Sequence, residues 1–470
     1  MPHARNKTRR YSPPIFTLTA ILAIFPHLAQ AQSPPATSET VVFSDVRVID
    51  GQGGPPLEHG AVVIAGDRIL WVGPASEGHW PKSARVLHLS GKTVLPGLIS
   101  DHSHVGQVDG TQLGSQNYNR GNILRQLRQY EVYGVTTVTA LGLNGELFYE
   151  LRAQLHAGTL PGADLFGADR GIGIPSGAPP NPPFNLPPGQ LYRVTTPQEA
   201  IEAVDEMATR KPDLIKVWVD DIHGTMPAKM SPEIYGAAIK EAHRLGLRAA
   251  SHIYDLGDAK SLVAQGVDII AHGVRDQPVD PDFISAMKAR SVWYIPTIAL
   301  DDASYIFAEH PDWLTDPFLA HALQPSLAAQ FADPAWRSKI LGNQKQVASA
   351  KAAVLTGEQN VKTLFDAGVR IGFGTDSGAM PLRVPGWAEH RELQLLVDAG
   401  LTPLQAIRLA TANAAALLDL HDRGIITSGK LADFLVVDGN PAAQIQDLNK
   451  ITAVYHRGKL VSNQVQDFTP

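Results

Sequence analysis

The sequence predicts an α/β protein in which a (β/α)8 barrel carries a small β-sandwich domain built from both chain ends. Two observations lead to this prediction. Residues 96–420 alternate between stretches of helical periodicity and short apolar stretches, which is typical of parallel βα units. Residues 41–95 and 421–465 instead contain short segments in which apolar and polar residues alternate, as in strands joined by turns.

The composition limits the classes of function. The 470 residues are 44% hydrophobic and 18% charged, which is typical of an ordered protein. The net charge of −6 shows no basic surplus, so we expect neither nucleic acid nor an anionic membrane as a partner. Because there is no cysteine, any transition-metal site must use imidazole and oxygen ligands.

Residues 1–31 have the pattern of a signal peptide. Four basic residues between Arg5 and Arg10 precede a short apolar segment, and Ala29-Gln30-Ala31 resembles a cleavage site. The apolar segment is shorter than the roughly 20 residues that a membrane-spanning helix needs, although an uncleaved anchor is the alternative. We expect an exported, periplasmic protein that begins at Gln32, has a linker over residues 32–40 and no longer binds the membrane. The sequence does not distinguish general secretion from twin-arginine export.

The two chain ends have similar patterns. Short strands with turn residues are predicted over 41–51, 60–73 and 84–95, and again over 429–439 and 451–462. The simplest arrangement packs these strands together as one β-sandwich domain. Residues 96–420 then form an insertion whose two ends lie close together.

Eight strands can be counted in this insertion, which is the number that a (β/α)8 barrel requires. They are predicted over 93–100, 135–142, 163–171, 214–221, 247–255, 267–273, 292–300 and 369–378. Two long segments follow strand ends, the proline- and glycine-rich residues 171–190 and residues 301–350. Such segments are either active-site lids or loops without a function of their own.

Polar residues interrupt the apolar pattern where the predicted strands end, and barrel chemistry belongs to those ends. These residues are His102, His104, Lys216, His252, His272 and Asp376. Because side chains alternate along a strand, His102 and His104 face one way and Asp101 faces the other. Taken singly, each histidine could be a hydrogen-bonded structural residue, Asp376 could cap a turn, and Lys216 could pair with Asp220 or Asp221.

Taken together, four imidazoles, one carboxylate and one lysine at a single barrel mouth indicate a metal site. Lys216 lies in the apolar stretch "LIKVWV", where burial lowers the pKa of a lysine and leaves a neutral amine. A neutral amine can add carbon dioxide to become a carbamate, whose two oxygens can bridge two divalent ions.

These residues resemble the metal-dependent amidohydrolase superfamily, in its imidazolonepropionase-like and Xaa-Pro-dipeptidase-like branch. The similar stretches are "LPGLISDHSH", "GTDSG", "SGKLADFLVVDGNP" and "HRELQLLVDAGLTPLQAIRLATANAAALLDL". The resemblance implies two divalent ions, with Zn²⁺ favoured over manganese or cobalt. It assigns His102 and His104 to the first ion, His252 and His272 to the second, and N6-carboxylated Lys216 to both. Asp376 would bind the first ion and carry a proton. One departure is Ser100, where the superfamily commonly has an acidic residue.

The resemblance implies a hydrolase that cleaves an amide-type C–N bond of a small molecule, such as a dipeptide or an N-acyl amino acid, with a metal-bridged hydroxide. The alternatives are a deaminase, a phosphotriester or lactone hydrolase, and a binding protein without catalysis. Lys216 argues against a mononuclear deaminase, and the six intact ligands argue against a binding protein.

Two more residues are predicted to contact the substrate. Tyr254 could do so or be a core tyrosine, and Arg275 could bind a carboxylate or pair with Asp276. A homo-oligomer is possible.

Overall fold

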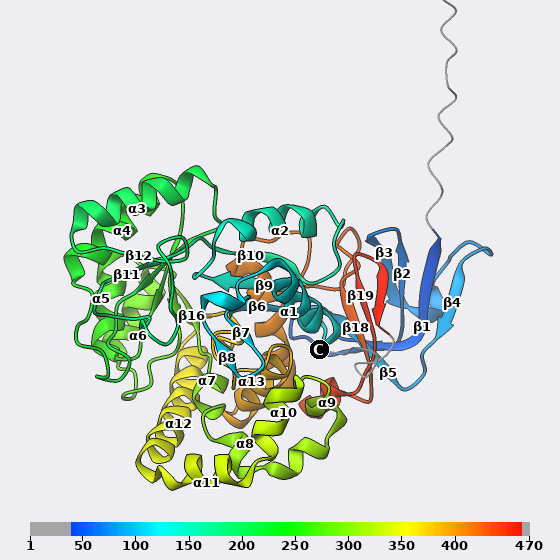
Figure 1. The fold of residues 1–470 in the computed structure, drawn as a ribbon. Helices are drawn as coiled ribbons and strands as arrows, with labels where there is room; N and C mark the ends of the chain where they lie inside the picture. Colours follow the sequence, from blue (N-terminus) through cyan, green and yellow to red (C-terminus); the bar gives the residue numbers. More distant parts are fainter. Residues whose placement is uncertain (1–38, 463–470) are drawn as a thin grey trace, which may run out of the picture. The chain divides into compact units, whose positions relative to one another are not determined.

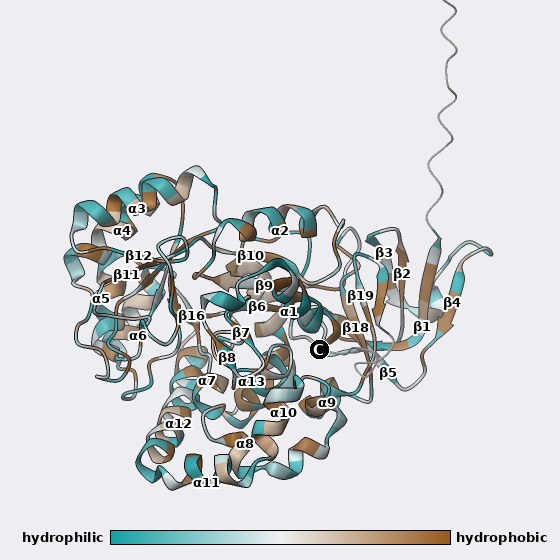
Figure 2. Cartoon of the chain, in the orientation of Figure 1, coloured by the Kyte–Doolittle hydropathy of each residue, from teal (hydrophilic) through white to brown (hydrophobic). Residues whose placement is uncertain are grey.

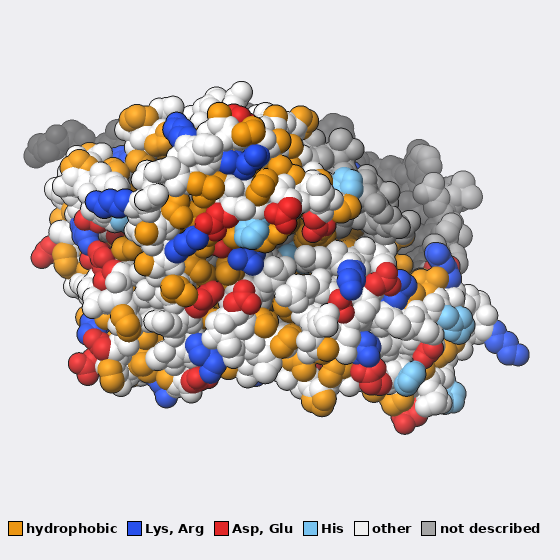
Figure 3. Space-filling model, turned by 90° about the horizontal axis from the view of Figure 1, so that it is seen from below, with side chains coloured by type: hydrophobic (Ala, Val, Ile, Leu, Met, Phe, Trp, Pro, Cys, Tyr) orange, Lys and Arg blue, Asp and Glu red, His pale blue; other side chains and the backbone are white. Residues whose placement is uncertain are grey.

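The computed structural model describes residues 39–462. The predicted signal peptide, residues 32–38 of the predicted linker and residues 463–465 of the predicted β-domain lie outside the described residues. Among residues 39–462, none of the helices combines the length and the apolarity needed to cross a bilayer. On the face seen in Figure 3, acidic and basic side chains are interspersed rather than gathered by sign.

Both ends of the described chain contribute to one mixed sheet of eight strands, in the order β20-β19-β18-β5-β1-β2-β3, with β4 paired to β1 (Figure 1). Strand β18 from the C-terminal part runs antiparallel to β5 from the N-terminal part, with Phe434 opposite Pro96. The strands are β1 (Thr40–Val48), β2 (Leu57–Ala65), β3 (Arg68–Pro74), β4 (Arg85–His88), β5 (Lys92–Pro96), β18 (Phe434–Asp438), β19 (Ile451–His456) and β20 (Lys459–Ser462). The predicted association of the two ends is therefore observed in this sheet.

Aromatic side chains from both ends form the core of this sheet. The ring of Phe43 on β1 lies 5.0 Å from that of Phe434 and 4.9 Å from that of Tyr455, both edge-on. Edge-to-face pairs of this kind contribute about 0.5–1.5 kcal/mol each beyond the area that they bury. The packing holds the two points where the chain leaves and re-enters the sheet near each other.

The middle of the chain forms two parallel sheets, in the orders β10-β9-β6 and β12-β11-β13-β14-β15-β16-β17. Isolated parallel bridges join Ala168 to Leu214 and Ser103 to Ser377. The strands are β6 (Leu98–Ser103), β9 (Val135–Leu141), β10 (Asp164–Ala168), β11 (Ile172–Gly173), β12 (Tyr192–Arg193), β13 (Ile215–Trp218), β14 (Ala249–His252), β15 (Ile269–Ala271), β16 (Trp293–Ile295) and β17 (Arg370–Ile371). Near β6, β7 (Val108–Asp109) and β8 (Gln112–Leu113) form a small hairpin. The predicted α/β fold with parallel strands is confirmed.

Helices connect successive parallel strands, and their sequences explain where they begin. Helix α3 starts after Thr196, whose side chain accepts a hydrogen bond from the backbone N–H of Glu199, and Pro197 occupies the first turn. Outer helices such as α3 show both apolar and polar residues along their length (Figure 2). The connecting helices are α1 (Arg120–Val132), α2 (Glu146–His156), α3 (Pro197–Thr209), α4 (Pro232–Arg244), α5 (Leu256–Gln265) and α6 (Pro281–Ala289).

The region after β16 is mainly helical. Residues 301–350, predicted as a long segment after a strand end, contribute several short helices and the start of a long one. The helices of this part are α7 (Ala299–Asp302), α8 (Ile306–Glu309), α9 (Pro317–Ala320), α10 (Pro325–Ala332), α11 (Pro334–Gly342), α12 (Gln344–Asp366), α13 (Trp387–Asp398), α14 (Pro403–Arg408) and α15 (Ala414–Leu417), with a π-helical turn at Leu409–Asn413.

The prediction of one strand over 93–100 was wrong, because the chain changes sheets at Gly97. Residues before it form β5 of the terminal sheet, and residues after it form β6 of the parallel sheet. A Cβ atom at position 97 would meet the side chain of Thr136, so glycine is required where the backbone passes this close to Thr136. The apolar run is continuous because both sheets bury it.

Candidate metal centre and active site

Strand ends bring the six predicted ligands to one region. His102 is in β6 and His104 follows it, Lys216 is in β13, and His252 ends β14. His272 follows β15, and Asp376 lies beyond β17. Oδ1 of Asp376 lies 3.3 Å from Nε2 of His102 and 3.1 Å from Nε2 of His104. One donor atom from each of His102, His272 and Asp376 lies within 4.8 Å of the others, a spacing that could hold a metal ion.

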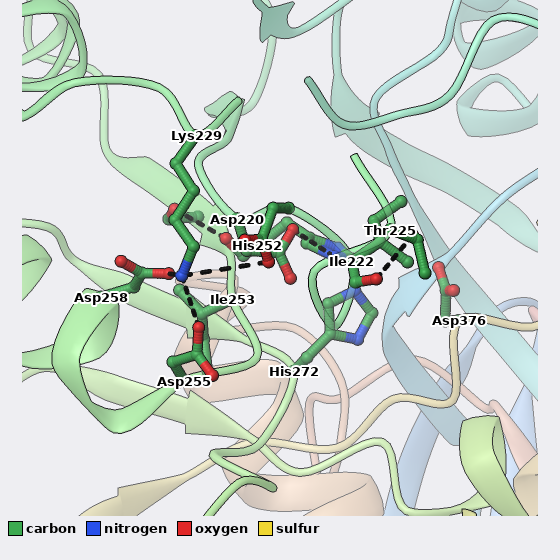
Figure 4. Close-up of polar contacts among 12 residues, drawn as sticks. Asp220, Ile222, Thr225, Lys229, His252, Ile253, Asp255, Asp258, His272 and Asp376 are labelled. Atoms are coloured by element: carbon green, nitrogen blue, oxygen red, sulfur yellow. Dashed lines mark hydrogen bonds and ion pairs between the residues drawn. The ribbon is translucent and has the colours of Figure 1, made fainter. Parts of the chain in front are cut away.

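The imidazoles form a contiguous group. The ring centre of His272 lies 4.3 Å from that of His102 and 4.3 Å from that of His252, and the rings of His102 and His104 are 5.7 Å apart. His102, Lys216 and His272 are buried. Figure 4 shows His252, His272 and Asp376 on neighbouring parts of the fold. The positions of these histidines and of Asp376 therefore agree with the prediction that the strand ends bring the candidate ligands together.

The backbone at two of these residues is unusual. His272 has φ of 101° and Asp376 has φ of 58°, a region that residues with a side chain rarely adopt. Strained backbone of this kind concentrates at functional sites, because the surrounding structure must hold it. Close by, a Cβ atom at Gly374 would lie 2.6 Å from the backbone nitrogen of His102, so only glycine lets the segment after β17 approach β6 this closely.

The side chains present fit a metal ion. Buried ring nitrogens of His102 and His104 and Nζ of Lys216 have no hydrogen-bond partner among the described residues. Such orphaned buried donors and acceptors are costly unless something binds them. Nδ1 of His272 lies 2.9 Å from Oγ1 of Thr297, an outer contact that would orient the ring and leave Nε2 for a metal.

Burial determines the protonation of the centre. It lowers the pKa of Lys216 to about 7, although Asp376 and Asp220 oppose this shift, so much of the amine is neutral near neutral pH. Burial also lowers the pKa of His102 and His272 well below the ordinary histidine value. For Asp376 burial alone would raise the pKa, but Arg383 and the neighbouring histidines hold it well below its ordinary value. Neutral imidazoles and an ionised carboxylate are the forms that bind metal.

Sequence reasoning missed two charged residues of this site. Asp220, weighed as a partner of Lys216, instead has Oδ1 3.2 Å from Nε2 of His252 (Figure 4). Arg383, from the loop after Asp376, donates a hydrogen bond from Nη1 to Oδ2 of Asp376. The sequence signal for Asp220 was its place directly after a buried strand, whereas no pattern marked Arg383.

A third missed residue, Glu389 of α13, supplies a carboxylate beside Ser100. Its Oε1 accepts hydrogen bonds from the hydroxyls of Ser100 (3.2 Å), Thr375 (2.6 Å) and Ser377 (2.7 Å). Its side chain is fully buried, and burial raises its pKa. Glu389 thus links β6 to the segment that carries Asp376. Its carboxylate lies beside Ser100, the first-strand position where the resemblance predicted an acidic residue.

The alternation argument for the first strand was incomplete. The pairing of β6 with β9 shifts register between Ser100 and Ser103. The hydroxyls of these two serines lie 2.7 Å apart, although strict alternation would place them on opposite faces. Asp101 is directed elsewhere as expected, since its Oδ2 accepts a hydrogen bond from the backbone N–H of Phe373.

The two residues predicted to contact the substrate, Arg275 and Tyr254, lie next to each other. Arg275 is buried, with Nη1 3.2 Å from Oδ2 of Asp301 and its guanidinium 5.1 Å from the ring centre of Tyr254. Its ion pair is therefore with Asp301, and not with Asp276. Tyr254 follows the end of β14 and stacks on His223 at 3.6 Å. Arg275 lines the cavity described next, and Tyr254 covers its guanidinium.

A cavity of about 210 Å³ opens onto the candidate ligands. The histidine, acidic and basic side chains that line it are His104, Asp220, His223, His252, Arg275, Asp376 and Arg383. Its remaining lining is Leu143, Ala178, Pro179, Pro180, Pro183, Phe184, Trp218, Ile222, Leu300, Ala379 and Met380. The proline-rich segment 171–190 thus borders the site, as expected for a lid, and the apolar lining suits a small organic molecule.

Comparison with known proteins identifies the family. A match to the amidohydrolase family covers residues 93–461, which include all six candidate ligands. The chain belongs to the amidohydrolase family. The amidohydrolase resembles the ochratoxinase of Aspergillus niger, with 25% identity over 464 residues, 90% of this chain and 86% of that enzyme. It also resembles the imidazolonepropionase of Streptomyces griseus, with 25% identity over 408 residues, 83% of this chain and 88% of that enzyme.

Solved structures resemble this amidohydrolase across its length. A putative prolidase from Bifidobacterium longum has a TM-score of 0.71 and 26% identity, with 91% of this chain and 96% of that chain covered. A phenylurea hydrolase B has a TM-score of 0.71 at 22% identity, over 90% of this chain and 97% of that chain, and shares the fold. The predicted superfamily branch is confirmed, and the chain is a hydrolase of carbon–nitrogen bonds.

Proposed function

We propose that this amidohydrolase holds two divalent metal ions, Zn²⁺ by preference, and cleaves the amide bond of a small N-acyl amino acid or dipeptide. The observation that carries the proposal is the clustering of four imidazoles, Asp376 and the buried Lys216 next to one cavity, which His104, His252 and Asp376 line. His102 and His104 would hold one ion, and His252 and His272 the other. Lys216, carboxylated on Nζ, would bridge them, because a neutral amine in a dry pocket can add carbon dioxide.

The protein side chains divide the remaining work. When bound, the ions would make a water acidic enough to act near neutral pH and would polarise the substrate carbonyl. Asp376 would accept the proton of the attacking water at Oδ2 and pass it to the departing nitrogen. Arg383, already bonded to Oδ2, keeps this carboxylate oriented. Arg275, beneath Tyr254, offers a guanidinium for a substrate carboxylate.

The finer architecture belongs to the same proposal. We infer that β6, β9, β10, β13, β14, β15, β16 and β17 close a (β/α)8 barrel over residues 96–420. The parallel bridges from Ala168 to Leu214 and from Ser103 to Ser377 support this closure. The aromatic contacts of Phe43 with Phe434 and Tyr455 support a β-sandwich at the chain ends, over residues 41–95 and 421–465.

Export completes the proposal. Residues 1–31 would direct the chain to the periplasm and be removed, which leaves Gln32 as the first residue. The intact mass of protein recovered from the periplasm tests this, and a mass that includes Met1 would contradict it.

The catalytic proposal is tested with protein reconstituted in Zn²⁺ and bicarbonate. We expect release of free amino acid from N-acyl amino acids or dipeptides, and its loss in Lys216→Ala. Release of ammonia from amino-substituted rings would favour a deaminase. Turnover of phosphotriesters alone would favour a phosphotriester hydrolase, and turnover of lactones alone a lactone hydrolase. No turnover of any of these compounds would favour a binding protein.

A further inference from the structure

We propose that an open cavity at the amino ends of strands β14, β16 and β17 binds the phosphate group of a small, soluble phosphate monoester. This cavity has a volume of about 680 Å³. Three arginines line it, and none of them forms an ion pair with a described residue. The side chains on which the proposal depends are Arg248, Trp293, Arg370, Arg408, Asn413 and Asp419.

The cavity and the candidate metal centre lie at opposite ends of the same parallel strands. Arg248 directly precedes β14, whereas His252 ends it. Trp293 is the first residue of β16, and Arg370 is the first residue of β17. Because a strand advances about 3.3 Å per residue, roughly 13 Å of chain separate Arg248 from His252. The two cavities share no lining residue, so this site is separate from the one proposed for hydrolysis.

Neutral groups hold the first two arginines in place. Arg248 donates a hydrogen bond from Nη1 to the carbonyl oxygen of Leu417. The guanidinium carbon of Arg370 lies 5.7 Å from the ring centre of Trp293, over the face of the indole. A guanidinium carries five N–H donors, and each of these contacts occupies at most a few of them. Both arginines therefore keep donors with which to bind an anion in the cavity.

An irregular helical turn positions the third arginine. Arg408 and Asn413 border the π-helical turn at Leu409–Asn413, and Nε of Arg408 donates to Oδ1 of Asn413 at 3.3 Å. In a regular α-helix, residues five apart do not lie on one face, so the wider turn brings these two side chains together. Asn413 also donates from Nδ2 to the carbonyl oxygen of Ile371 at 3.0 Å, which fixes this amide against β17. Turns of this kind are frequent at functional sites.

The charges that line the cavity favour an anion with two negative charges. Asp419 is the one acid among the described residues of the lining, and its Oδ1 lies 3.2 Å from Nε2 of His421. Three guanidinium groups and one carboxylate leave an excess of two positive charges. A phosphate monoester carries nearly two negative charges at neutral pH, and the planar guanidinium matches pairs of phosphate oxygens.

Arginines elsewhere in the structure show what is unusual here. Nε of Arg391 lies 2.8 Å from a carboxylate oxygen of Asp302, and Nη1 of Arg423 lies 2.7 Å from one of Asp164. A bound phosphate would supply to the three cavity arginines the anionic partner that these two arginines find within the protein.

Calorimetric titration of the metal-loaded protein with glycerol 3-phosphate tests the site. We expect saturable binding, which the double variant Arg370→Gln/Arg408→Gln should weaken by about 100-fold, since each lost hydrogen bond to a charged group costs about tenfold. Arg408→Lys keeps the charge but not the planar fork, so it should weaken binding less than Arg408→Gln does. Neutral glycerol should not bind.

A matched control removes two positive charges from another part of the surface. Lys82→Gln/Arg85→Gln changes exposed residues at and just before β4, and it should bind glycerol 3-phosphate as the wild type does. Because Arg370 and Arg408 are also exposed, both double variants should keep the thermal unfolding midpoint and the metal content of the wild type.

Three results would overturn the proposal. The first is no saturable binding of glycerol 3-phosphate. The second is binding that Arg370→Gln/Arg408→Gln leaves unchanged, which would place the phosphate at the metal centre instead. The third is equal weakening in the control, which would show a general effect of net charge. Sedimentation with phosphatidylcholine vesicles that contain phosphatidic acid tests a lipid source of the same group, and binding to these vesicles without binding of glycerol 3-phosphate would contradict a soluble ligand.

Discussion

Removing the buried carboxylate of Glu389 should lower both the stability of the fold and the retention of metal at the candidate centre. Glu389→Ala removes the acceptor of the hydroxyls of Ser100, Thr375 and Ser377 and of the backbone N–H of Gly386 (2.9 Å). An unsatisfied buried polar group costs about 1–3 kcal/mol. Because the serines have other hydroxyl partners, we expect a total loss of about 3–6 kcal/mol in the free energy of unfolding. Glu389→Gln keeps one acceptor oxygen and should cost about 1 kcal/mol.

Chemical denaturation measures this loss, and metal retention against a chelator measures its effect on the site. Thr375 and Ser377 flank Asp376, so Glu389→Ala should also weaken metal retention by about 10- to 100-fold, as outer-shell changes do. Glu202→Ala, an exposed acid on α3, is the control and should change stability by less than about 0.5 kcal/mol. The reasoning is refuted if Glu389→Ala unfolds like this control and keeps its metal.

Two further predictions concern other titratable groups. Lys216→Ala should lose metal and activity together, and short carboxylic acids should restore both in part. Lys216→Arg should be inactive, because a guanidinium stays protonated. Wild-type activity in Lys216→Arg would show that Lys216 is only a structural cation. The pKa of His456 is raised to about 10, since Asp433, Asp164 and Glu131 outweigh burial. Because the folded pKa exceeds the unfolded one, this stabilisation is complete below about pH 6.5 and is lost as pH rises towards 10. Urea unfolding at several pH values should show that the difference in free energy of unfolding between wild type and His456→Gln shrinks across that pH window. A difference that stays constant with pH would contradict the raised pKa of His456.

The strand-end residues were predictable because their signal is local. A polar residue that interrupts an apolar strand is visible in the sequence, and parallel strands bring their carboxyl ends to one edge. His102, His252 and His272 therefore came together without knowledge of the tertiary structure. The family and the parallel α/β fold are confirmed, whereas the roles of the six residues as metal ligands stay predictions.

What sequence reasoning missed depends on tertiary packing. Glu389 reaches Ser100 from a helix, and Arg383 reaches Asp376 through a loop, so no periodicity marks either residue. The change of sheet at Gly97 was hidden because both sheets bury the same apolar run. The register shift near Ser103 is likewise a feature of strand pairing, which alternation along one strand does not reveal.

The central claim is a binuclear metal centre, and metal content measures it most directly. Elemental analysis of the protein reconstituted with Zn²⁺ and bicarbonate should find about two ions per chain. His102→Ala and His272→Ala should each retain about one ion and lose nearly all turnover, because each removes a ligand from a different ion. One ion or none in the wild-type protein, or two ions with full activity in either variant, would contradict the account.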